Sequence, residues 1–294
     1  MPRMFFVVPD QEWATIPLVE LRRLGLFEQP NLLVSYFYFP TLEHLKRLKA
    51  ALPPYAEPTW FLDSGAFSAW TTETSLRLSD YLAWLKGAFD ILGRDRIYAY
   101  ANLDVVRNPA LTWRNQRVIE RSGFRPLPVI HSNASPETVE QVVEEYDTFA
   151  VGGLVGGGSN STHYEEFLAG VFDKATTRHG IHTIHGFGVT SYPIMRRFPF
   201  SSVDSSSWMA GARWGRFRLF DPRTCTHIEV DMISKRGSYV KAIELLSACY
   251  PYSMKELKEL RHARSRQWRA AIGTLSILSY RYIVERVRRH QNET

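Results

Sequence analysis

The sequence predicts an α/β fold, a (β/α)8 TIM barrel with a basic helical extension at its C-terminal end. Short apolar runs alternate with segments of helical spacing through residues 4–204, and eight of these runs read as strands. Several runs end in Asp, His or Gly, and the C-terminal ends of barrel strands are where such folds place their chemistry. The chain has 294 residues, of which 45% are hydrophobic, so it is long enough to bury one large core.

The expected strands are short and apolar, and each is followed by polar or glycine residues. In chain order they cover residues 4–8, 32–39, 59–63, 97–104, 127–131, 148–151, 181–185 and 202–204. If the first of these runs were not a strand, a doubly wound open sheet would be the better fold.

The expected helices carry apolar residues every three or four positions and have recognisable ends. Thr41 and Ser135 are the expected N-caps of two of them, and Gly25 and Gly123 are expected stops. The helices are expected over residues 13–26, 41–52, 78–92, 111–122, from 135 onward, 164–178 and 192–198.

The character of the chain changes after residue 212, so we expect a barrel core over 1–212 and an extension over 213–294. Residues 218–220 and 226–232 are expected to pair as a hairpin, and residues 253–289 have helical spacing. The basic side chains of this region fit either the solvated face of helices packed on the barrel or a nucleic-acid-facing surface. They are Lys255, Lys258, Arg261, Arg264, Arg266, Arg269, Arg281, Arg286, Arg288 and Arg289.

Composition excludes several classes of protein. The two cysteines, Cys225 and Cys249, are far apart, so neither a disulfide framework nor a cysteine zinc site is expected. The sequence contains no signal peptide or membrane-spanning stretch that we recognise, which leads us to expect a cytoplasmic protein. The net charge of +6 is compatible with a polyanionic partner but does not require one.

Three aspartates carry the argument about chemistry. Asp63, Asp104 and Asp204 each follow a different expected strand, so a closed barrel would gather them at one mouth. Such a trio could hold a metal, act as acid and base on a sugar, or supply a nucleophile. His131 and His185 could join them, or each could be a core histidine satisfied by the backbone.

Two glycine clusters follow later strands. The run from Gly152 to Gly158 lacks the Lys-Ser/Thr of a P-loop and the order of a dinucleotide site. A loop that lets a flat ligand approach the backbone is the better interpretation, and Gly186 and Gly188 fit the same role.

These residues together resemble a known family, the tRNA-guanine transglycosylases. The similar motifs are Asp63-Ser64-Gly65-Ala66-Phe67, Asp104, Gly152-Gly153-Leu154, His185-Gly186-Phe187-Gly188 and Asp204, in the family's order. The family consists of (β/α)8 barrels that exchange a guanine in nucleic acid for a 7-deazaguanine through a covalent aspartyl intermediate. The resemblance implies that Asp204 is the nucleophile at C1′ and that Asp63 is the general acid and base.

The resemblance also implies a base-binding set and no cofactor. Asp104 would read the 2-amino and ring N–H edge of the purine, Gly153 and Leu154 would contact the base through their backbone, and Phe67 and His185 would sandwich it. The implied base-binding residues are Ser64, Phe67, Asp104, His131, Gly152, Gly153, Leu154, His185 and Gly186.

The chain departs from the family at three places. Ala66 replaces a glycine, His131 stands where we would align a base-reading glutamine, and the family's Cys/His zinc site is absent, so no metal is expected. The chain is therefore more similar to the compact relatives from phages and bacterial genomic islands that insert preQ0-type 7-deazaguanines into DNA. The expected location is the cytoplasm of a bacterium or a phage-infected host.

The expected partners are DNA, or alternatively tRNA, together with the 7-deazaguanine base and partner proteins that open the duplex. Five arginines are expected to grip phosphates: Arg213, Arg216, Arg261, Arg264 and Arg269. A nucleoside hydrolase and a catalytically silent nucleic-acid-binding barrel stay open as alternatives.

Overall fold

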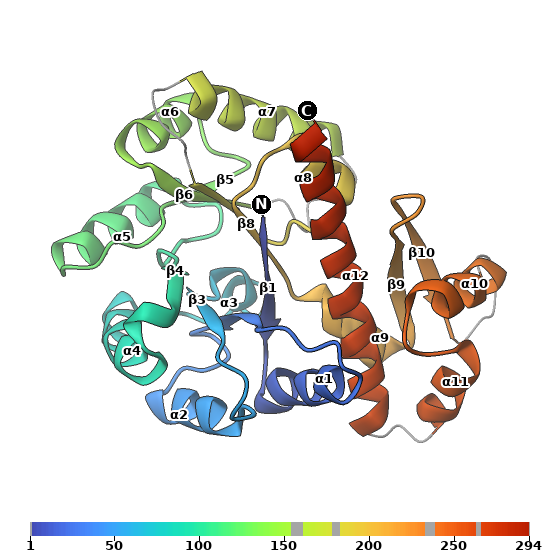
Figure 1. Ribbon diagram of the computed structural model, residues 1–294. Helices are drawn as coiled ribbons and strands as arrows, with labels where there is room; N and C mark the ends of the chain where they lie inside the picture. The colour runs from blue at the N-terminus through green and yellow to red at the C-terminus, as the bar shows by residue number, and fades with distance from the viewer. Residues whose placement is uncertain (1, 154–160, 178–182, 233–238, 263–265, 294) are drawn as a thin grey trace.

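Eight parallel strands form one curled sheet at the centre of the molecule, with helices on its outside (Figure 1). The computed structural model describes residues 2–153, 161–177, 183–232, 239–262 and 266–293. The strands are β1 (Arg3–Val8), β2 (Asn31–Ser35), β3 (Thr59–Asp63), β4 (Ile97–Tyr100), β5 (Val129–His131), β6 (Thr148–Gly152), β7 (Thr183–Gly186) and β8 (Ser202–Ser205). The predicted (β/α)8 barrel is confirmed, and the open doubly wound sheet is not adopted.

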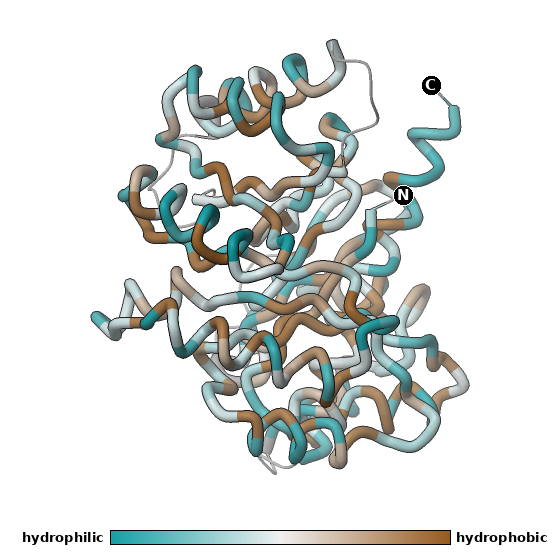
Figure 2. Tube along the Cα trace, turned by 90° about the vertical axis from the view of Figure 1, so that its left-hand side faces the viewer, coloured by the Kyte–Doolittle hydropathy of each residue, from teal (hydrophilic) through white to brown (hydrophobic). Residues whose placement is uncertain are grey.

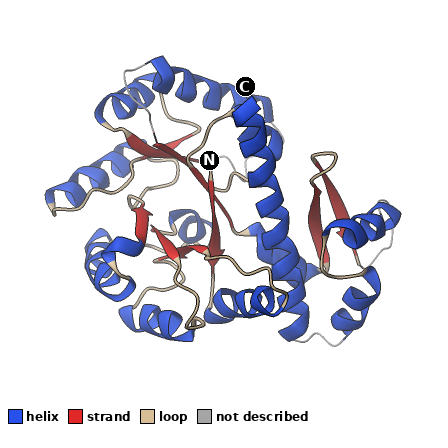
Figure 3. Cartoon of the chain, viewed as in Figure 1, coloured by secondary structure: helices blue, strands red, loops and turns tan. Residues whose placement is uncertain are grey.

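The helices of the barrel occupy its outer layer, where their apolar faces cover the sheet (Figure 3). They are α1 (Gln11–Arg23), α2 (Leu42–Ala51), α3 (Ala66–Thr71), α4 (Leu78–Leu92), α5 (Pro109–Arg121), α6 (Pro136–Glu145), α7 (Ser161–Thr177) and α8 (Tyr192–Arg197), with the short 3₁₀ helices η1 (Arg94–Arg96) and η2 (Ser207–Met209). The Thr41 and Ser135 side chains accept hydrogen bonds from the first turns of α2 and α6, as their cap positions predict. The sequence does not predict α3.

The barrel is closed between β4 and β5, the two strands at the edges of the sheet. The sheet runs in the order β4-β3-β2-β1-β8-β7-β6-β5. A parallel bridge joins Ala101 to Leu127, because the Asn102 N–H donates to the Leu127 carbonyl (3.0 Å) and the Leu127 N–H donates to the Tyr100 carbonyl (2.8 Å). The carboxyl ends of all eight strands therefore meet at one mouth.

The interior of the barrel is filled with apolar side chains, so it is a packed core and not a pore. This core forms the floor below the barrel mouth. Figure 2 shows the hydrophobic residues concentrated along the central strands, with hydrophilic residues toward the outside. The inward-facing set is Phe5, Val7, Leu33, Phe61, Ala101, Leu127, Val129 and Ala150. Polar side chains at the strand ends lie above this floor.

Two strands end earlier than the sequence predicts. β2 stops at Ser35 because the N–H groups of Tyr38 and Phe39 both donate to the Ser35 carbonyl and make a turn. β4 stops at Tyr100, so Asp104 lies in the following loop instead of at the strand end.

The extension begins with a short helix and a hairpin. α9 (Ala210–Trp214) leads into β9 (Arg216–Asp221), which pairs antiparallel with β10 (Thr226–Asp231), close to the predicted pairing. α10 (Tyr239–Cys249) packs on the hairpin, and α11 (Met254–His262) contacts α10 and α12. The sequence does not predict α10.

The last helix, α12 (Arg266–Glu293), lies between the barrel and the hairpin in Figure 1. It contacts α1, α8 and β1 on one side and β9 on the other, and its residues 270–279 are all buried. The middle of this helix is therefore a core element, and its charged residues lie on either side of residues 270–279. No helix in the described ranges is both long and apolar enough to cross a membrane.

Candidate active site

Asp63 stands at the end of β3, where a tight turn aims its carboxylate at the barrel mouth. The Gly65 N–H donates to its Oδ2 (2.9 Å). Gly65 has φ +76°, and a Cβ there would lie 2.2 Å from the Ser35 Oγ and 2.3 Å from the Phe37 Cβ. Only glycine fits this turn, which explains why an Asp-Ser-Gly sequence follows the strand.

Burial, and after it the nearby carboxylates of Asp104 and Asp204, raise the pKa of Asp63 to about 8. The N–H groups of Gly65 and Ser64 act against this shift but do not cancel it. At neutral pH Asp63 is therefore largely protonated and is able to donate a proton.

Asp104 is held at both oxygens by side chains from neighbouring strands. The Ser64 Oγ donates to Oδ1 (3.2 Å), and the His131 Nε2 lies 2.8 Å from Oδ2. The Ser64 hydroxyl is fully buried and also accepts the Ala66 N–H. This network fixes the orientation of the Asp104 carboxylate, which leaves its remaining lone pairs for a ligand.

Asp204 ends β8 and has hydrogen-bond donors around it. The Gly188 N–H donates to its Oδ1 (2.9 Å), and the His185 Nε2 lies 3.3 Å from the same oxygen. The His185 Nδ1 in turn contacts the Ser202 Oγ at 2.8 Å. The approach of Nε2 to Asp204 satisfies the ion-pair distance but not the geometry of a hydrogen bond. His185 and Ser202 thus position Asp204 from below.

The predicted sandwich of a base between Phe67 and His185 is wrong for the His185 side. The His185 ring is 1% exposed, and its ring centroid lies 4.3 Å from that of Phe61 and 4.6 Å from that of Phe187. Aromatic side chains already occupy its surroundings, so no base can stack on it. Phe67, by contrast, lies on α3 and is 47% exposed.

The glycine positions divide between the mouth and the outer layer. Gly152 faces His131, because a Cβ there would lie 3.3 Å from the His131 Cδ2. Gly153 is exposed, with its carbonyl accepting the Ser132 hydroxyl (2.9 Å). Gly186 faces outward, since a Cβ would meet Val189 and Phe200, so packing accounts for this glycine. Leu154 lies outside the described residues.

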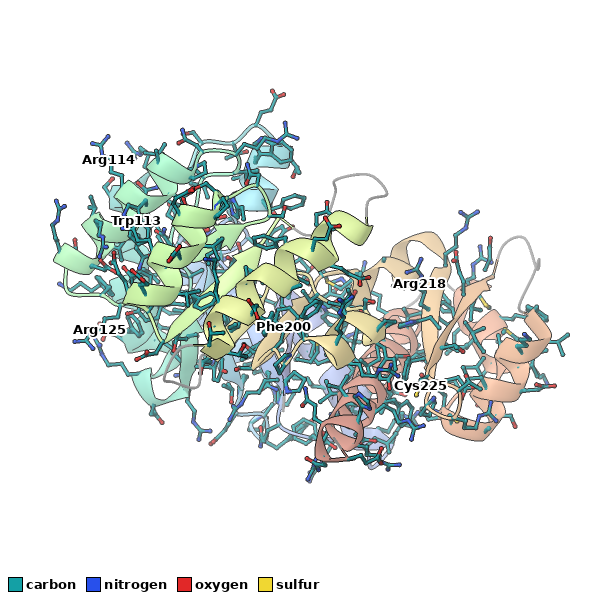
Figure 4. All side chains as sticks on the ribbon, turned by 90° about the horizontal axis from the view of Figure 1, so that it is seen from above. Trp113, Arg114, Arg125, Phe200, Arg218 and Cys225 are labelled. Carbon is teal, nitrogen blue, oxygen red and sulfur yellow. The ribbon has the colours of Figure 1, made fainter. Side chains whose placement is uncertain are left out.

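The predicted phosphate-binding arginines whose side chains the structure describes lie on β9, α11 and α12, and have partners within the chain. Arg216 pairs with Asp231 (3.0 Å), Arg261 donates to the Met232 carbonyl (2.7 Å), and Arg269 pairs with Glu12 in the first turn of α1. The Arg213 side chain and Arg264 lie outside what the structure describes. Positive charge is not confined to the extension: in Figure 4, Arg114 and Arg125 lie across the molecule from Arg218.

Within the described ranges, no three His, Cys, Asp or Glu side chains form a group that could hold a metal ion. Asp104 and Asp204 instead have hydrogen-bonding partners of their own, Ser64 and His131 for Asp104, and Gly188 for Asp204. The arrangement supplies a neutral acid, an oriented acceptor and a carboxylate with donors, all within one mouth.

Ser202 and Gly188 are site residues that the predicted set lacks. Ser202 precedes Asp204 by two positions on the same strand, so both side chains point into the barrel, whereas Ser205 points outward to Tyr280. The period of two along a strand is therefore the signal that identifies Ser202. Gly188 contributes only its N–H, which no side-chain pattern reveals.

Comparisons with known proteins give no family for this chain. No family model and no curated protein matches it. Among solved structures, it is similar to a putative fructose-1,6-biphosphate aldolase from Coccidioides immitis, with 13% identity, a TM-score of 0.45 and coverage of 95% of this chain and 89% of that one. It is also similar to a protein from Aquifex aeolicus VF5 (10% identity, TM-score 0.43, coverage 95% and 93%). A third similar structure is a mutant tryptophan synthase alpha-subunit from Pyrococcus furiosus (11% identity, TM-score 0.41, coverage 71% and 88%).

Proposed function

We propose that this protein is a guanine transglycosylase that exchanges guanine in DNA for a 7-deazaguanine base. The observation that carries the proposal is the contrast between the surroundings of Asp63 and Asp204, which lie at the same mouth of the barrel and interact electrostatically. The pKa of Asp63 is raised to about 8, whereas Asp204 lies beside the Gly188 N–H and His185. Base exchange needs such a pair, a proton donor for the leaving base and a carboxylate that attacks the sugar.

In the first half-reaction Asp63 gives its proton to the departing guanine. The C1′–N9 bond breaks with its electron pair going to the base, and an Asp204 oxygen forms a bond to C1′. In the second half-reaction Asp63, now ionised, takes a proton from the incoming base, whose nitrogen attacks C1′. The C1′–O bond breaks, and its electron pair returns to the Asp204 carboxylate.

Base recognition falls to the half of the mouth built by β3, β4 and β5. Asp104, oriented by Ser64 and His131, accepts the paired N–H donors of the purine edge. The exposed ring of Phe67 covers one face of the base. His185 acts through Asp204 as a positioning residue and does not touch the base.

DNA is preferred over tRNA because the chain lacks the Cys/His zinc site that the resembling tRNA enzymes carry. The target guanine has to leave the helix to reach a pocket at the mouth of a barrel. The arginines of the extension are proposed to contact the phosphates of the strand, for which Arg216 and Arg269 would exchange their Asp231 and Glu12 partners for phosphates.

A trapping assay tests the proposal. The protein is mixed with labelled single-stranded DNA, duplex DNA, tRNA or free deoxyguanosine, with and without a 7-deazaguanine base. Denaturing gels and mass spectrometry then report an adduct at Asp204 and base exchange. Adduct and exchange on DNA support the proposal, and exchange on tRNA alone corrects the substrate. Release of guanine from free deoxyguanosine without any exchange would establish a hydrolase and overturn it.

A further inference from the structure

The exposed aromatic side chains of the described residues gather at one part of the mouth. Among all large apolar side chains that are exposed there, the aromatic ones are Tyr38 (40%), Phe67 (47%) and Trp70 (45%). Tyr38 follows β2, whereas Phe67 and Trp70 lie on α3 directly after the Asp63 strand. Exposed apolar side chains that cluster on a surface mark a site of interaction more often than single ones do.

A cation accompanies this group. The Arg107 guanidinium lies over the Trp70 ring, 5.0 Å from its centroid, and would move to the phosphate when a base stacks there; the Trp70 and Phe67 ring centroids are 6.0 Å apart. Arg107 is exposed and follows Asp104 by three residues, so it stands beside the proposed base reader. An aromatic face with an adjacent guanidinium can bind a base by stacking and its phosphate by charge.

Two residues near Trp70 have a left-handed backbone conformation, one on the same segment and one on the loop that carries Arg107. Arg107 has φ +63° and Glu73 has φ +54°, and these are two of the three non-glycine residues with positive φ in the described chain. Left-handed backbone at such residues costs free energy, and it clusters at binding sites. The strain therefore adds a second, independent mark to the place where the rings are exposed.

We propose that Trp70 and Arg107 form a stacking platform for the unpaired nucleotide next to the target guanine. The inference rests on the proposed function for the identity of the target, and adds to it a second binding position on the strand. Phe67 meets the base that enters the pocket, Trp70 stacks on its neighbour, and Arg107 pairs with the phosphate between them. The platform selects an unpaired strand, because the faces of bases in a duplex are already covered.

Binding to oligonucleotides tests the platform without requiring catalysis. Binding of a labelled single-stranded DNA is measured by fluorescence anisotropy with proteins that all carry Asp204→Asn. One has no further change, and the others carry Trp70→Ala, Trp70→Phe or Arg107→Ala. Trp70→Ala is expected to weaken binding about tenfold, and Trp70→Phe is expected to retain most of the affinity. Arg107→Ala is expected to reduce the slope of log K against log salt by about 0.7, the value for one phosphate on a single strand.

The control is Ile243→Ala, which removes an exposed apolar side chain from α10, and circular dichroism checks that each variant is folded. Placing 5-iodouracil beside the guanine and irradiating should give a cross-link that mass spectrometry maps to Trp70. Unchanged affinity in Trp70→Ala, with no cross-link there, overturns the platform even if exchange occurs. If Trp70→Ala weakens binding but the protein with Asp204 intact shows no exchange on any substrate, the platform is kept and the proposed function is overturned.

Discussion

Asp63 and Asp204, on two sides of the barrel mouth, have different surroundings. On the β3 side, Asp63 is surrounded by protein and by two further acids, and its pKa is raised to about 8. On the β8 side, Asp204 receives the Gly188 N–H and has His185 at 3.3 Å. Identical side chains thus have different surroundings, and under the proposed function Asp63 carries the proton whereas Asp204 attacks the sugar.

Substituting Asp204 tests the nucleophilic half and has the largest expected effect. Asp204→Asn keeps the shape of the side chain and removes the carboxylate, so base exchange should fall by about 10⁴-fold or more. Single-turnover assays measure this loss, and oligonucleotide binding should be unchanged. Measurable exchange at wild-type rates in this variant would remove Asp204 from its role.

Substituting Asp63 tests the acidic half. Asp63→Ala should lower the exchange rate by about 10²–10⁴-fold, the usual contribution of a general acid or base. Because only the protonated form donates, the wild-type rate should also decline as the pH rises past about 8, the raised pKa of this group. A rate that stays level up to pH 9 would contradict the assignment.

Ser202 and Ser205 provide a matched pair on the two faces of β8. Ser202→Ala removes the contact to the His185 Nδ1, so kcat should fall about tenfold with KM little changed, as for the loss of an orienting partner. Ser205→Ala removes a contact to Tyr280 in the outer layer and should leave kcat unchanged. Equal effects from the two variants would mean that Ser202 matters only for stability.

The raised pKa of Asp63 should make the free energy of unfolding depend on pH. The native state keeps a proton that the unfolded chain releases above its ordinary value of 3.8, so the free energy of unfolding falls as pH rises from about 4 to about 8. Asp63→Asn has no such proton. Its Tm relative to the wild type should therefore rise with pH across this range, by about 2 °C or more in calorimetry. A difference in Tm that is independent of pH would show that burial does not shift this group.

The sequence predicts the barrel well because its strands and helices follow local rules. The Thr59–Asp63 strand and the Leu78–Leu92 helix are found with the predicted bounds, since apolar period and flanking polar residues define both. α3 is missed because six residues after a glycine turn carry too short a pattern. Residues 253–289 are predicted as helical and basic, yet the middle of α12 is buried, because contacts from both sides decide its surroundings.

The sequence predicts which residues belong to the candidate site better than it predicts what each of them contacts. Asp63, Asp104 and Asp204 follow strands and converge as parallel topology requires. The burial of His185 depends on Phe61 of a distant strand, so no local pattern reveals it. Gly188 acts through its backbone, and the partners of Arg216, Arg261 and Arg269 come from segments far away in sequence.

The contact between α1 and α12 has a consequence for how the protein is made. α1 (Gln11–Arg23) is synthesised well before its packing partner α12 (Arg266–Glu293), because about 240 residues lie between them. At about 5–20 residues per second, the ribosome needs roughly 13–50 seconds between the two. Throughout that time the apolar face of the first helix has no native cover from the last. We therefore expect nascent chains stalled before residue 266 to recruit chaperones, and chains released after α12 to leave them.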